Sequence, residues 1–100
     1  MPLKTYLIVR PTEACLEIIR SRLRPPLKEE NLEGWDAVLL LQGYVAELLE
    51  AVDIATKATK VKAAEIVGNC PQQFNTIALW GRVSEVKQAL LVLKERRKVE

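Results

Sequence analysis

The chain has 100 residues, of which 49% are hydrophobic and 28% charged, and its formal net charge is +2. This length and composition predict a single globular domain over residues 1–100, and the small net charge gives no reason to expect nucleic acid or an anionic membrane as a partner. No window approaches the about 18 apolar residues that a membrane span needs, and the N-terminal apolar run is too short for a signal peptide, so we expect a cytoplasmic protein.

The first part of the chain predicts a strand, a helix and a second strand. Residues 6–10 are nearly all apolar and predict a short strand that is buried on both faces. Thr12 is a good N-cap for a helix over residues 13–23. A polar, turn-rich connection over residues 25–36 then leads to a strand at residues 37–43.

The second part predicts a helix, two strands and a final helix. Apolar residues at helical spacing predict a helix over residues 44–60. Residues 63–68 and 75–81 predict two strands. Ser84 is the expected N-cap of a last helix over residues 85–98, whose basic end suits a helix C-terminus.

Each predicted helix has one apolar face that we expect to be buried. On the first helix this face is formed by Cys15, Ile18, Ile19 and Leu23. On the second helix it is formed by Val45, Leu48, Leu49, Val52 and Thr56, and on the third by Val86, Ala89, Leu90 and Leu93. Because a free cysteine behaves as a small hydrophobe, Cys15 is predicted to be a core residue. Trp80 lies in a predicted strand and is expected in the core or in an interface.

The predicted order of elements is β-α-β-α-β-β-α. Without its first strand and helix this order becomes β-α-β-β-α, which lacks only the last strand of a ferredoxin-like β-α-β-β-α-β unit. A circular permutation that moves the last strand and helix to the N-terminus would supply the missing strand. The predicted fold is therefore α/β, a permuted ferredoxin-like sandwich. Strand 6–10 is expected to pair in the same sheet as strand 37–43.

The connection between the last two predicted strands has an unusual composition. It reads Gly68-Asn69-Cys70-Pro71-Gln72-Gln73, whereas a plain tight hairpin would use Asn-Gly or Asp-Gly. Gly68 is expected to let the strand turn without a Cβ clash, and Pro71 biases Cys70 toward an extended backbone that aims its thiol. The chain has two cysteines and no histidine. Cys70 is therefore either a free thiol in a loop or a ligand of an all-sulfur metal site.

Several segments of the chain resemble the shell proteins of bacterial microcompartments (BMC). They read "GYVAELLEAVDIATKATKV", "AAEIVGN", "TIALWGRVSEVKQAL" and, at the front of the chain as in the permuted branch of that family, "YLIVRPTEACLEII". The likeness extends over residues 6–93. Because the motif Gly-x-Cys-Pro-Gln stands intact in the hairpin loop, the chain is most similar to the permuted shell proteins of glycyl-radical-enzyme microcompartments.

The resemblance implies a structural protein that forms flat cyclic hexamers, which tile with other shell proteins into a microcompartment shell in the cytoplasm. It implies that the loops over residues 68–73 surround a central pore and that Cys70 holds an iron–sulfur cluster there. Gln72 and Gln73 either line this pore, where their amides can donate and accept hydrogen bonds, or are ordinary polar loop residues. An iron–sulfur cluster needs about four thiolates. Since cyclic symmetry brings several copies of one cysteine to one axis, we expect about one cluster per hexamer, of the 4Fe–4S type. Electron transfer across the shell, oxygen sensing and closure of the pore are all open roles for it.

Lys57 has two interpretations. By resemblance it matches the lysine that packs at the edges between hexamers in the shell family, so it is the expected hexamer-edge residue. A solvated helix face is the ordinary alternative for a lysine.

A protein of another class also fits the residues. It is a small oligomeric, ferredoxin-like regulatory or metabolite-binding domain in which Cys70 is a redox-sensing thiol. The oligomeric state discriminates between the two, because a shell protein should give hexamers and sheets. An enzyme is less favoured, since the chain lacks histidine, a nucleophile–base pair and a Gly-rich phosphate loop. RNA binding is less favoured because "TIALWG" lacks the exposed aromatic residues on which bases stack.

Overall fold

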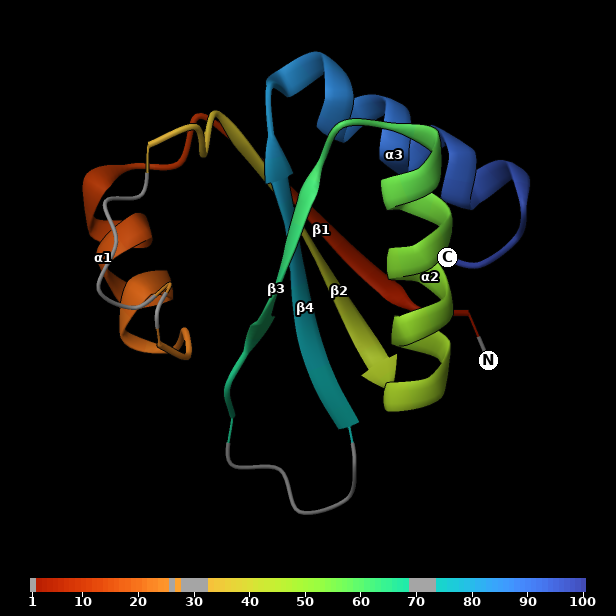
Figure 1. The fold of residues 1–100 in the computed structure, drawn as a ribbon, viewed down its shortest axis with the longest axis horizontal. Coiled ribbons are helices and arrows are strands. Elements are labelled where there is room, and N and C mark those ends of the chain that lie inside the picture. Colours follow the sequence, from red (N-terminus) through yellow and green to blue (C-terminus); the bar gives the residue numbers. More distant parts are fainter. Residues whose placement is uncertain (1, 26, 28–32, 69–73) are drawn as a thin grey trace.

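The computed structural model describes residues 2–25, 27, 33–68 and 74–100. Its helices and strands follow the predicted order (Figure 1): β1 Lys4–Val9, α1 Glu13–Ser21, β2 Ala37–Tyr44, α2 Val45–Ala58, β3 Lys62–Ile66, β4 Phe74–Gly81 and α3 Val83–Glu95. The predicted elements are thus confirmed in type and order, and their ends differ by a few residues.

The strands form one antiparallel sheet in the order β1-β2-β4-β3. β2 and β4 lie in the centre, and β1 and β3 form the two edges. The pairing of the N-terminal strand with β2 is confirmed, since Leu7 lies opposite Leu39 in the register of β1 and β2. β1 therefore completes the sheet although α1 and a long connection separate it from β2 in the sequence.

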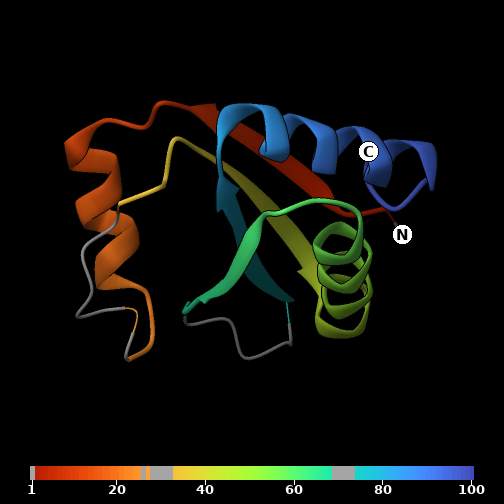
Figure 2. The same cartoon turned by 45° about the horizontal axis from the view of Figure 1, so that its top comes forward.

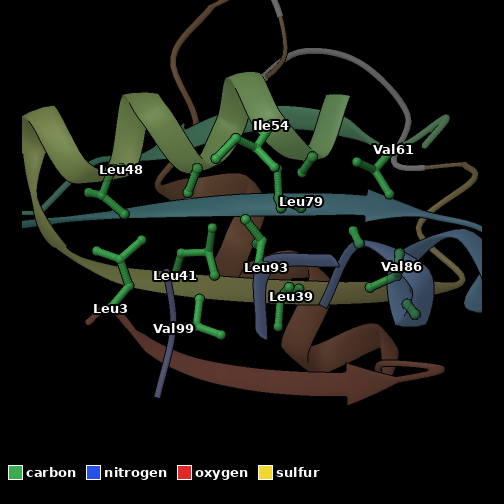
Figure 3. Close-up of a cluster of buried hydrophobic side chains, with 14 residues drawn as sticks. Leu3, Leu39, Leu41, Leu48, Ile54, Val61, Leu79, Val86, Leu93 and Val99 are labelled. Atoms are coloured by element: carbon green, nitrogen blue, oxygen red, sulfur yellow. The ribbon is translucent and has the colours of Figure 1, made fainter. Parts of the chain in front are cut away.

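One face of the sheet is covered by α2 and α3, and α1 lies on the other side (Figure 2). The larger core lies under α2 and α3, where apolar side chains of the sheet meet those of the two helices (Figure 3). Its fully buried leucines and valine include Leu39, Leu41, Leu79, Leu48, Leu93 and Val86. Full burial of each such side chain stabilises the fold by about 1.5–3 kcal/mol. This face therefore supplies most of the apolar burial that holds the domain together.

The smaller core lies between the sheet and α1. It contains Ile19 and Leu23 from α1 and its C-terminal end, together with two tryptophans. The rings of Trp35 and Trp80 stack with their centroids 4.3 Å apart and an angle of 8° between their planes. Cys15 is partly buried and packs against this cluster. The predicted core positions of Cys15 and Trp80 are thus confirmed.

The helix starts show one prediction confirmed and one wrong. Thr12 caps α1, because its Oγ1 accepts a hydrogen bond of 3.2 Å from the amide of Cys15. Ser84 is not the cap of α3, which begins at Val83 with Arg82 as its N-cap. The backbone of Arg82 is extended, with φ −64° and ψ 147°. The helix therefore begins directly after β4 and leaves Ser84 inside the first turn.

Some residues that were predicted to be buried are exposed in the single chain. β1 is not buried on both faces, since Tyr6 is 52% exposed and the strand is an edge with one neighbour. Ile18 is 63% exposed and Leu49 is 60% exposed, although both were placed on inward helix faces. Each directly neighbours a core residue, Ile19 or Leu48. Because a step of one residue turns about 100° around a helix, the neighbour of a core residue points away from the core.

The two chain ends meet beside β1. Leu3 and Val99 form a parallel bridge, in which the amide of Leu3 donates to the carbonyl of Lys98 at 3.0 Å. Leu3 is buried over Gly43, where an added Cβ would run into Leu3 Cδ2. A glycine at position 43 therefore makes room for the N-terminal segment. None of the helices that the structure describes has the length and apolarity to cross a membrane.

Candidate functional site

The predicted site lies in the connection between β3 and β4. Asn69, Cys70, Pro71 and the two glutamines Gln72 and Gln73 lie outside the described residues, so their predicted roles remain predictions. Gly68 is described, and an added Cβ there would meet no atom within 4 Å. Its φ is not in the left-handed region either. Among the described residues no contact requires a glycine at position 68, and the predicted role of Gly68 in the turn remains a prediction.

The two arms of the connection have different neighbours. The pairing of β3 with β4 ends at Ile66 and Thr76, whereas β4 stays paired with β2 as far as Phe74 and Tyr44. The next residue of the β3 arm, Val67, bonds to α1 instead of β4, because its amide donates to the carbonyl of Arg22 at 2.8 Å. β3 thus bends away from β4 before the connection begins (Figure 1). Sequence reasoning did not find this contact, since no pattern in residues 13–24 indicates a partner at Val67.

A polar pair lies on the central strands near the β4 arm. Gln42 Nε2 donates to Thr76 Oγ1 at 3.2 Å across β2 and β4, and the pair is partly buried. Its side chains lie on the same face as the smaller core, because Gln42 and Leu40 alternate with the buried Leu39 and Leu41. The sheet face under α1 is therefore polar toward the end at which the connection lies.

The described residues give a clear result for metal binding within one chain. They contain no group of three or more His, Cys, Asp or Glu side chains that could hold a metal ion. Cys15 packs against the smaller core, and it belongs to no such group of donors in the described part of the chain. An iron–sulfur cluster requires about four thiolates, and one chain offers only Cys70 besides Cys15. The donor set therefore fits a cluster only where several copies of Cys70 meet.

Lys57 lies on the exposed surface of α2. It is in the last turn of the helix, and its Nζ is 2.8 Å from the Asp53 carboxylate one turn earlier. Both side chains are well exposed to solvent. Such an exposed pair stabilises a helix by about 0.3–0.5 kcal/mol, so Lys57 has little importance for the fold itself and is accessible to a neighbouring molecule.

A hollow of about 440 Å³ lies at the opposite end of the sheet from the connection. It is lined by strand ends and by the start of α3, with the basic residues Lys60, Lys62 and Arg82 and the acidic residues Glu33, Asp36 and Glu85. The amide of Lys60 donates to Glu85 Oε1 at 2.7 Å. Sequence reasoning missed this hollow, because its lining residues are far apart in the chain. Its mixed charges select no particular class of ligand.

The comparisons with known proteins decide the family. The model of the BMC domain matches residues 38–98, which extend from β2 through α3. The chain belongs to the BMC domain family. The resemblance to BMC shell proteins is thereby confirmed. The mixed α/β fold with its antiparallel sheet is confirmed as well. A search of curated proteins gives no match.

Two solved structures share the fold of this BMC domain. The ligand-free GrpU microcompartment shell protein from Pectobacterium wasabiae is 24% identical, with a TM-score of 0.69 over 90% of this chain and 98% of that chain. The GrpU microcompartment shell protein from Clostridiales bacterium 1_7_47FAA is 22% identical, with a TM-score of 0.62 over 92% of this chain and 91% of that chain. Both likenesses cover at least 90% of this chain, so nearly all of it follows a known shell-protein fold.

Proposed function

We propose that this BMC domain protein is a structural tile of a microcompartment shell that assembles as a cyclic hexamer with the connection over residues 68–73 around its axis. The match of the family model to residues 38–98 carries the proposal. The matched part contains most of the larger core and both arms of the connection. No nucleic acid, membrane or substrate is needed for this role, so we propose that the partners are copies of this chain and other shell proteins.

We further propose that the chain is circularly permuted. Two observations support this. The family model begins at residue 38, after β1 and α1, yet β1 occupies an edge position of the same sheet. In addition, Leu3 and Val99 are bridged, so the chain ends lie together, as a permutation requires.

Cys70 is the proposed ligand of an iron–sulfur cluster in the pore, of the 4Fe–4S type and about one per hexamer. Support comes from its place in the connection and from the all-sulfur donor set of a chain that has no histidine. When bound, such a cluster would supply one-electron chemistry. The chain's own contribution is to hold the thiols of several subunits near one axis. The Gly68 to Gln72 motif supports the association with a glycyl-radical-enzyme microcompartment, because it is the segment that carries that likeness.

Anaerobic reconstitution tests this proposal. The wild-type protein should sediment as a hexamer and take up iron and sulfide at well under one cluster per chain. Cys70→Ser should remain hexameric and bind no cluster, because the thiol is a pore group and makes no packing contact in this account. The matched control, Cys15→Ser, should keep the cluster and lose some stability, since Cys15 packs against the smaller core. Equal iron and sulfide in wild type and Cys70→Ser would refute the pore cluster.

A further inference from the structure

The β3 arm of the connection is held by α1. Val67 follows the last residue of β3 and precedes Gly68. Its amide donates to the carbonyl of Arg22 at 2.8 Å, and its carbonyl accepts from Arg22 Nη1 at 3.3 Å. Both backbone groups of Val67 are therefore satisfied by one residue of α1's C-terminal end.

These bonds also give a hydrogen-bond partner to a backbone carbonyl at the end of α1. Arg22 is the C-cap of α1, where the last carbonyls of a helix lack partners within the helix. An edge strand such as β3 likewise has backbone groups that face no neighbouring strand. Since the carbonyl of Arg22 and the amide of Val67 pair with each other, the helix end takes the place of the missing strand at this point.

An ion pair lies beside these backbone bonds. Arg24 Nε is 2.8 Å from Glu65 Oε1, and the two residues come from the segment after α1 and from β3. We call Arg22, Arg24, Glu65 and Val67 the α1 clasp. It makes three polar contacts between segments that are more than 40 residues apart in the chain.

The helix end that carries the clasp is packed in the smaller core. Ile19 and Leu23, which flank Arg22, are buried in the smaller core with Trp35 and Trp80. The carbonyl of Arg22 is therefore presented by a packed helix end. Without it, the residue after Ile66 would have only β4 as a neighbour, and the register of β3 and β4 already ends there.

We propose that α1 positions the arm of the connection that leads to Cys70, with Arg22 and Arg24 as positioning residues. The inference rests on the proposed function in that Cys70, three residues beyond Val67, is the group to be positioned. A cluster shared between subunits needs several thiols held within bonding reach of one centre. The bonds to Arg22 fix Val67 at the start of each connection, and they keep β3 apart from β4 there.

The test measures how exposed each thiol is, by alkylation of the cluster-free protein and mass spectrometry of the peptides that contain Cys70 and Cys15. The variants are Arg24→Glu, Glu65→Arg and the double exchange, which restores an ion pair with reversed polarity. An exposed ion pair contributes modestly, and loss of a local contact increases local opening. We therefore expect Cys70 to react about two- to fivefold faster in each single variant, and at the wild-type rate in the double variant.

Two controls separate positioning from general instability. Cys15 should keep its wild-type alkylation rate in all variants, because it packs against the smaller core from the first turn of α1, whereas Arg24 follows the C-terminal end of this helix. Glu17→Arg places the same charge change on α1 at a residue that pairs with Arg20, and it should leave the rate at Cys70 unchanged. Unchanged rates at Cys70 in both single variants, or raised rates that the double exchange does not restore, would overturn the inference.

Cluster loading of the same proteins distinguishes this inference from the proposed function. If the wild type binds a cluster, the single variants should lose it faster in air and the double variant should match the wild type. If the wild type binds no cluster but alkylation follows the expected pattern, the pore cluster is wrong and the positioning of the arm by α1 stands. If the cluster is present and alkylation ignores the ion pair, the positioning by α1 is wrong.

Discussion

The two faces of the sheet are built in different ways. The face under α2 and α3 rests on a large core of aliphatic side chains that are almost fully buried. The face under α1 rests on a small core with one stacked tryptophan pair, and specific polar contacts tie α1 to β3. The part that the family model matches, residues 38–98, contains the first face almost entirely. We infer that the two sides have different roles. The packing of α2 and α3 stabilises the domain, whereas α1 holds the end of β3 in position.

The largest effect should come from truncating a leucine of the larger core. Leu39 and Leu40 are neighbours in β2 that point to opposite faces, and Leu39 is fully buried whereas Leu40 is partly buried against the smaller core. Leu39→Ala should lower the free energy of unfolding by about 3 kcal/mol or more. Leu40→Ala should cost about 1 kcal/mol, because less of its side chain leaves water on folding. Urea unfolding of the two variants measures the contrast, and equal losses would break it.

A smaller effect is expected in the tryptophan pair. Trp35→Leu keeps an apolar side chain over Trp80 but removes the stacked ring, which contributes about 0.5–1.5 kcal/mol beyond its buried area. We expect a loss of about 1–2 kcal/mol in unfolding free energy, together with weaker protection of the Val67 amide in hydrogen exchange, since this amide bonds to the end of α1. Normal protection at Val67 in a destabilised Trp35→Leu protein would show that the clasp does not depend on the smaller core.

The smallest effect on stability should come from Lys57. Lys57→Asp removes an exposed pair with Asp53 and should change the free energy of unfolding by no more than about 0.5 kcal/mol. The hexamer should form normally, while electron microscopy should show fewer or smaller two-dimensional sheets, because a negative charge replaces the proposed edge lysine. A variant that tiles as well as the wild type would return Lys57 to an ordinary solvated helix face.

The sequence predicted the elements and their order because apolar periodicity and turn residues are local signals. It also predicted the pairing of β1 with β2. A ferredoxin-like unit that lacks its last strand leaves one position in the sheet empty, and β1 was the strand available to fill it. Local patterns failed where burial depends on the neighbours of an element. Tyr6 and Ile18 are apolar residues in regular elements, yet both are exposed, because β1 is an edge and α1 turns Ile19 toward the sheet.

The candidate site was only partly predictable. The Gly-x-Cys-Pro-Gln motif drew attention to the connection, and the bounds of β3 and β4 confirm that this segment joins two paired strands. The role of α1 there was not predictable, because Arg22 and Val67 are 45 residues apart and meet mainly through backbone groups. Every residue except proline carries the same backbone N–H and C=O groups, so such a contact leaves no trace in the sequence.

The most direct test of the central claim is electron microscopy of the anaerobically purified protein beside Cys70→Ser. The account predicts rings with six-fold symmetry for both proteins, with the β3–β4 connections nearest the axis and density on the axis in the wild type alone. Monomers or dimers in both samples, or rings whose axis is lined by other elements, would contradict it.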